Sequence, residues 1–142
     1  MTITERVQYS STKLDREPPA SEEVIGKLIP EAGLKLPEDY WDFLLQLNGG
    51  EKELGIQRGW FRTQRAEEVI QAGLETEVPK CAHGFFAFGG NGGGELLAFD
   101  TLRDIPWPMV ALPFTAVNAG GAMHAAGHFN EFVAQMGKAF QE

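Results

Sequence analysis

Two of the three histidines, His124 and His128, lie four residues apart. On a helix this spacing places both imidazoles on one face, where they could bind a metal ion. The zinc-protease motif also needs a glutamate directly after the first histidine, but Ala125 stands there. Nearby glycines disfavour a regular helix, and only His83 remains as a third histidine ligand. A metal-dependent enzyme using these three histidines is a minor alternative, and we expect no metal or other cofactor.

Other catalytic arrangements are weaker still. Cys81 is the single cysteine and has only His83 as a neighbouring base, which does not indicate an activated thiol. Glu95 and Asp100 could act as an acid–base pair. Five residues apart on a strand, however, they would be about 17 Å from each other on opposite faces, too far for a glycosidase pair. No serine lies in a glycine-flanked strand-to-helix elbow, so no active site is predicted.

The stretch Phe85–Asp100 organises the chain. Two apolar runs flank residues 89–94, which are all glycine except Asn91. A phosphate-binding loop needs lysine where Glu95 stands, and the third glycine of a dinucleotide-binding pattern also falls on Glu95. Asn-Gly between apolar runs instead predicts a β-hairpin, because these residues tolerate the positive φ of a tight turn.

The totals are those of one globular domain. The chain has 142 residues, 43% hydrophobic and 23% charged, enough to bury a real core. No apolar run approaches the ~20 residues that span a bilayer, and the N-terminus does not read as a signal peptide. The lone Cys81 suits a reducing compartment, so we expect a cytoplasmic protein. Residues 1–19 predict an irregular lead-in, and residues 20–142 predict the domain.

The charge is unevenly distributed. The net charge is −8, and residues 15–53 carry ten acidic against four basic side chains. Residues 67–100 carry six acidic side chains against one basic, whereas residues 54–66 hold three arginines and no acid. This balance argues against nucleic acid or an anionic membrane as partner. It suits a basic protein partner, but from composition solubility alone is the preferred explanation.

Apolar spacing predicts the helices. Ser21 is a candidate N-cap for a helix that Pro30 ends or kinks. A second helix is predicted to begin at Pro37 and to end at 48–50. Its apolar stripe has helical spacing and comprises Tyr40, Phe43, Leu44 and Leu47, widened by Trp41 and Leu45.

The rest of the chain alternates strands with two more helices. Strands are expected at 56–63, 85–88, 95–100 and 109–112, helices at 64–72 and 129–136, and a loop at 116–128. Arg58, Trp60 and Arg62 share one face of the strand at 56–63; this face could be a cation–π surface, but an edge strand is the preferred interpretation. The order predicts an α+β domain with a mainly antiparallel sheet flanked by helices.

Three of these segments resemble the SUKH superfamily, which includes the fungal cell-wall-synthesis regulator and bacterial immunity proteins. The first is Leu36–Leu44, closing with Asn48-Gly49-Gly50; the second is the glycine hairpin Phe88–Asp100; the third is the aromatic helix beginning at Phe129. Order and spacing fit over roughly residues 20–137.

The resemblance implies an α+β domain without catalytic residues, in which bacterial members bind and neutralise toxin effectors, often nucleases. The positions that match the family and read as structural are Asn48, Gly49, Gly50, Gly94 and Asp100. The uncharged loop at 116–128 departs from the family pattern.

Together these observations give a hypothesis: an acidic immunity protein that occludes a basic toxin. Carboxylates would stand in for substrate phosphates, with Glu38, Asp39, Asp42 and Glu95 as the predicted partner-binding residues. The rival of another class is a regulatory scaffold domain, as in the fungal relatives.

Overall fold

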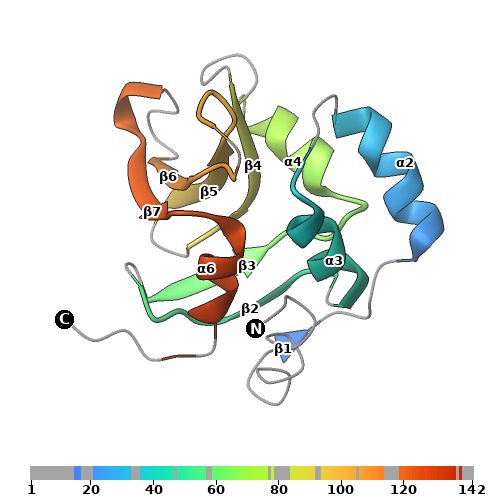
Figure 1. Ribbon diagram of the computed structural model, residues 1–142, viewed down its shortest axis with the longest axis horizontal. Helices are drawn as coiled ribbons and strands as arrows, with labels where there is room; N and C mark the ends of the chain where they lie inside the picture. Colours follow the sequence, from blue (N-terminus) through green and yellow to red (C-terminus); the bar gives the residue numbers. More distant parts are fainter. Residues whose placement is uncertain are drawn as a thin grey trace.

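A computed structural model describes residues 15–16, 21–32, 36–46, 48–56, 59–76, 78, 84–91, 94–104, 106–113, 119–136 and 138. Within these residues, the centre is an antiparallel sheet whose seven strands lie side by side in sequence order (Figure 1). The strands are β1 (Asp15–Arg16), β2 (Gly50–Glu53), β3 (Trp60–Thr63), β4 (Phe85–Gly90), β5 (Glu95–Asp100), β6 (Met109–Pro113) and β7 (Met123–Ala126). The predicted α+β class with an antiparallel sheet is confirmed.

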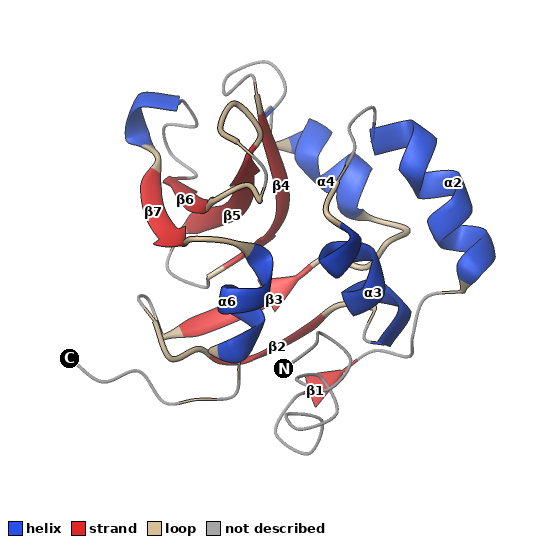
Figure 2. Ribbon diagram, in the orientation of Figure 1, coloured by secondary structure: helices blue, strands red, loops and turns tan. Residues whose placement is uncertain are grey.

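The described residues include four α-helices beside the sheet: α2 (Glu22–Ala32), α3 (Glu38–Gln46), α4 (Val69–Glu75) and α6 (Phe129–Ala134). The Ser21 hydroxyl caps α2 by accepting a hydrogen bond from the Val24 amide at 3.2 Å, as predicted. α2 runs through Pro30 to Ala32, so Pro30 does not end it. Helix α3 packs on both α2 and α6 (Figure 2). Within the described residues, no helix has the length and apolar character needed to cross a bilayer.

The central strands are buried on both faces. Successive side chains of a strand point to opposite faces, and β4 and β5 carry apolar residues at nearly every position. One face holds Phe86, Phe88, Leu97, Phe99 and Met109, which join α2, α3 and α6 in the larger hydrophobic cluster. The other face holds a smaller cluster of Phe85, Ala87, Leu96, Ala98, Val110 and Leu112.

Aromatic rings fill the larger cluster. Tyr40 of α3 meets Phe129 of α6 edge to face at 5.6 Å, and both rings lie against Phe88 and Phe99 of the sheet. Edge-to-face pairs at this spacing contribute about 0.5–1.5 kcal/mol each beyond burial. The apolar stripe predicted for α3 is therefore core, and it fixes this helix to the sheet.

The structure corrects several predicted boundaries. The strand expected at 56–63 is shorter and central, because β3 starts at Trp60 and pairs with both β2 and β4. It is not the edge strand that we preferred. The helix expected at 64–72 lies later, at Val69–Glu75. Part of the loop expected at 116–128 forms β7, which pairs with β6. Asp15 and Arg16 of the expected irregular lead-in pair with β2 as β1.

Gly89 lies where β4 packs closely against the main chain of β3. It pairs with Thr63 on β3 and follows a register shift between Ala87 and Gly89 in the pairing with β5. A Cβ at this position would collide with the backbone carbonyl oxygen of Arg62. The glycine-rich segment therefore serves strand approach as well as the turn.

Tyr40 leads to a stability prediction. Its hydroxyl is fully buried without a hydrogen-bond partner among the described residues, and burial raises the pKa of this phenol. Because an unpaired buried hydroxyl costs free energy, we expect Tyr40→Phe to raise the free energy of unfolding by about 1 kcal/mol. Urea denaturation measures the change. A less stable variant would show that the hydroxyl does have a partner in solution.

Candidate partner-binding surface

Three of the four predicted partner-binding carboxylates lie together on the first turns of α3. Glu38 and Asp42 are exposed and Asp39 is half-buried, whereas the next residues inward, Tyr40 and Phe43, belong to the core. Asp42 is four residues from Glu38 and three from Asp39, so all three carboxylates share one side of the helix. The exposed side of a core-anchored helix thus presents a concentrated negative charge.

The three carboxylates repel one another. Partial burial raises the pKa of the Asp42 carboxyl, and the negative charges of Asp39 and Glu38 raise it further. Glu38 and Asp39 also meet the positive end of the helix dipole, whereas Asp42 lies one turn further along. A cationic side chain of a partner would therefore reduce the electrostatic repulsion at Asp42 more than at Glu38 or Asp39.

The fourth predicted residue, Glu95, lies elsewhere. It is only 5% exposed at the start of β5, and its carboxylate accepts a hydrogen bond from the Asn91 side-chain amide at 2.8 Å. The Asn91 backbone amide donates to the Glu95 carbonyl at 3.1 Å. Glu95 therefore holds the hairpin turn and presents no carboxylate at the surface.

The Asn48-Gly49-Gly50 motif fastens the end of α3 to the approach to α4. The Asn48 side-chain oxygen accepts from the buried Ala66 amide at 2.7 Å, and its NH₂ donates to Glu67 at 2.7 Å. Gly49 has a φ of 91°, and a Cβ there would come within 2.9 Å of the Thr63 carbonyl oxygen. Gly50 then begins β2. These contacts join the segment after α3 to the segment before α4.

Gly94 and Asp100 occupy the two ends of β5. Gly94 has a left-handed φ of 84° just before the strand. The Asp100 carboxylate accepts from the Leu102 amide at 3.1 Å and lies 3.4 Å from the Arg103 guanidinium. Asp100 is thus a turn-former, as predicted. With Glu95 at the opposite end of the strand, the two carboxyls form no acid–base pair.

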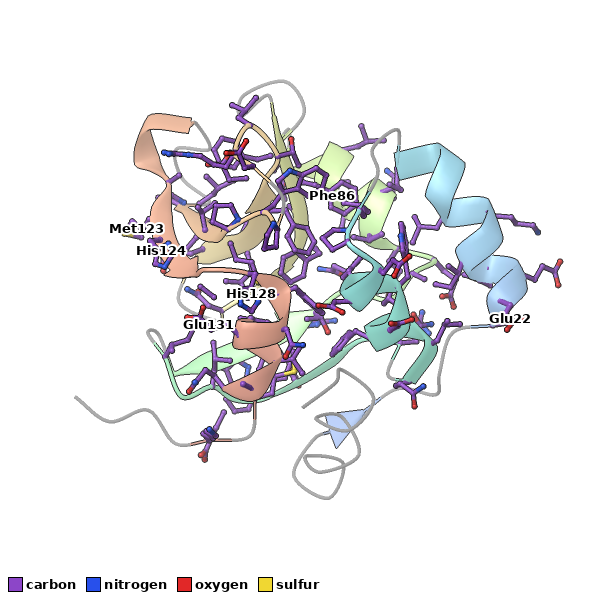
Figure 3. All side chains as sticks on the ribbon, in the orientation of Figure 1. Glu22, Phe86, Met123, His124, His128 and Glu131 are labelled. Carbon is purple, nitrogen blue, oxygen red and sulfur yellow. The ribbon has the colours of Figure 1, made fainter. Side chains whose placement is uncertain are left out.

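The histidines do not share a helix face. His124 lies exposed on β7, whereas His128 precedes α6, where its Nδ1 accepts from the Glu131 amide at 3.2 Å (Figure 3). The Glu131 carboxylate in turn accepts from the Gly127 amide at 3.2 Å, which makes a reciprocal cap. His83 and Cys81 lie outside the described residues. Among the described residues, no three His, Cys, Asp or Glu side chains gather as metal ligands.

Trp60 and Arg62 lie on the same face of β3, as the alternation predicted. Trp60 is half-buried and Arg62 is exposed. Glu53 and Glu51 are their respective partners in register on β2. Arg58, which the sequence placed on this face, lies outside the described residues.

Asn48 yields a second prediction. Asn48→Ala would leave the buried Ala66 amide without an acceptor, so we expect a loss of about 2 kcal/mol in the free energy of unfolding. The exposed Gln71→Ala, which removes only a 3.4 Å contact to Glu75, should change it by less than about 0.5 kcal/mol. Equal effects in chemical denaturation would contradict the role of Asn48.

Asp42 yields a third. Because its pKa is raised in the folded state, the folded protein binds this proton more tightly than the unfolded chain, and stability falls as pH rises through that range. Asp42→Asn should therefore stabilise the protein at pH 7, by about 0.2–0.5 kcal/mol. The difference should shrink below about pH 3, where the wild-type carboxyl is protonated in both states, and in high salt. A variant less stable at pH 7 would contradict this assignment.

Comparison with known proteins now places the chain. Residues 19–135 match the family model described as the SMI1 / KNR4 family (SUKH-1). No curated protein matches the chain. The match covers every described element from α2 to α6 and all three motifs that carried the resemblance. The chain therefore belongs to the SMI1 / KNR4 (SUKH-1) family.

Proposed function

We propose that this domain is a non-catalytic, protein-binding immunity protein that neutralises a basic toxin effector by covering it. The observation that carries the proposal is the cluster of Glu38, Asp39 and Asp42 on the exposed side of α3. Membership of the SUKH-1 family supports a protein-interaction domain of this general type.

Rigidity supports the choice of α3 as the binding element. Its inner side is fixed by Tyr40, Phe43 and Leu44, which are no more than 1% exposed. The helix backbone that carries the carboxylates is therefore preorganised, so little backbone entropy is lost on binding. The carboxylates would occupy the positions that the phosphates of a nuclease substrate take on a basic toxin surface.

Electrostatics supports a basic partner. The chain carries a net charge of −8, which steers a cationic protein toward it and repels nucleic acid. Partial burial and the neighbouring charges of Asp39 and Glu38 raise the pKa of Asp42, and a cationic side chain would offset the repulsion among these carboxylates. The single cysteine is consistent with action in the cytoplasm.

The decisive experiment is co-expression with a toxic protein encoded next to this chain. We expect the wild-type protein to protect the cell and to form a complex with the toxin. Neutralising the α3 cluster with Glu38→Gln, Asp39→Asn and Asp42→Asn should weaken the Kd at least about tenfold, or 1.4 kcal/mol. It should also flatten the salt dependence of the association rate.

The matched control removes three other exposed carboxylates, with Glu22→Gln, Glu23→Gln and Asp104→Asn. Both triple variants change the net charge equally. An equal loss of affinity in the control would therefore show that net charge, and not the α3 cluster, determines binding. A partner bound without any protection from toxicity would favour the regulatory scaffold class. No complex at all would overturn the proposal.

A further inference from the structure

A groove of about 460 Å³ lies on the sheet face that carries Trp60 and Arg62, within the ~300–1,000 Å³ typical of ligand sites. One bank is formed by β2 and β3, and the other by the C-terminal half of α4. Small residues leave the space open. Gly89 and Gly90, which pair with β3, line the groove from β4, and Ala72 and Gly73 line it from α4. The groove is separate from the carboxylates of α3, none of which lines it.

Negatively charged groups line both sides of the groove. Glu51 lines it from β2 and Glu75 from the end of α4. The C-terminus of α4 adds the negative end of a helix dipole, and no basic residue lies in its last turn to offset it. Arg62 is the single cation among the described lining residues and forms no ion pair with any other described residue. Two carboxylates and a helix end thus outweigh one exposed guanidinium.

Trp60 and the floor of the groove determine which cationic side chain fits it. The half-buried indole of Trp60 borders the space, and Ala87 and Leu96 contribute an apolar floor. A guanidinium can stack on an indole face and bind a carboxylate in a bidentate manner, whereas a lysine ammonium cannot do both as a planar group. The apolar floor would cover the aliphatic part of the same side chain.

We propose that this groove receives an arginine side chain of the partner protein, held by the Trp60 ring and the Glu51 and Glu75 carboxylates. The proposal rests on the proposed function for the existence of a basic partner. It adds a second, structurally distinct contact, on the opposite face of the sheet from the aromatic cluster that anchors α3.

The test uses short peptides, so it does not depend on the toxin. Acetyl-Ala-Arg-Ala-amide is titrated into the ¹⁵N-labelled protein, with the Gln and Glu versions of the peptide as controls. We expect saturable shifts of the Trp60 indole and the Gly89 and Gly90 amides with the Arg peptide only. The proposal is overturned if the Arg peptide does not bind, or if it binds no more tightly than the Gln or Glu version.

Substitutions in the groove are expected to change the affinity for the Arg peptide in opposite directions. Glu51→Gln and Trp60→Leu should weaken binding of the Arg peptide severalfold, whereas Arg62→Gln should strengthen it, because Arg62 repels the guest. Trp41→Phe, on α3 away from the groove, should change nothing. If Arg62→Gln weakens binding of the Arg peptide, Arg62 does not repel the guest as the proposed arrangement requires, and the proposal fails. A toxin complex that keeps its affinity in Glu51→Gln and Trp60→Leu would leave the α3 proposal intact and exclude only the groove.

Discussion

The contact of two distant helices through aromatic rings is the constraint on which the rest of the structure depends. Tyr40 of α3 and Phe129 of α6 are almost ninety residues apart, yet their rings meet at an angle of 89° above Phe88 and Phe99 of the sheet. Both helices are short, 9 and 6 residues, and such helices are not stable alone in water. The sheet therefore gives them their stability, and they in turn cover its larger apolar face.

This packing explains why an acidic helix surface can exist at a fixed place. Like charges on neighbouring turns destabilise an isolated helix. In the folded protein, partial burial and then the charges of Asp39 and Glu38 raise the pKa of Asp42. Burial of Phe43 and Leu44, both 0% exposed, supplies several kcal/mol on the same helix. The free energy gained by burying the inner side of α3 thus exceeds the cost of repulsion among the carboxylates on its outer side. Family membership, fold and charge agree with a protein-interaction domain, and the partner itself is a proposal.

Elements with a strong local pattern were predictable from the sequence. The stripe of α3 has an unambiguous helical spacing, and the two arms of the glycine hairpin are apolar at nearly every position, so β4 and β5 were found within two residues of their bounds. β7 was missed because Met123–Ala126 has neither β-branched residues nor a clear alternation; pairing with β6 makes it a strand. The start of α4 was misplaced because residues 64–68 have no apolar spacing that distinguishes a turn from a helix.

The candidate site was predictable only in part, for a related reason. Three carboxylates on one helix follow from spacing alone, whereas the burial of Glu95 depends on Asn91 reaching back across the turn. The groove was not foreseeable, because its banks come from β2, β3 and α4, whose relative positions depend on long-range pairing. The shared face of Trp60 and Arg62 was the one local signal for it.

The close approach at Gly89 has an evolutionary consequence. At Gly89 the floor of the groove is main chain, because a side chain at that position would collide with the neighbouring strand. That part of its shape is therefore inherited with the fold, whereas the charged side chains of Arg62 and Glu75 lie at exposed positions, where substitutions cost little stability. Under the proposed arginine contact, related chains could change the side chain that the groove accepts by altering only these exposed positions.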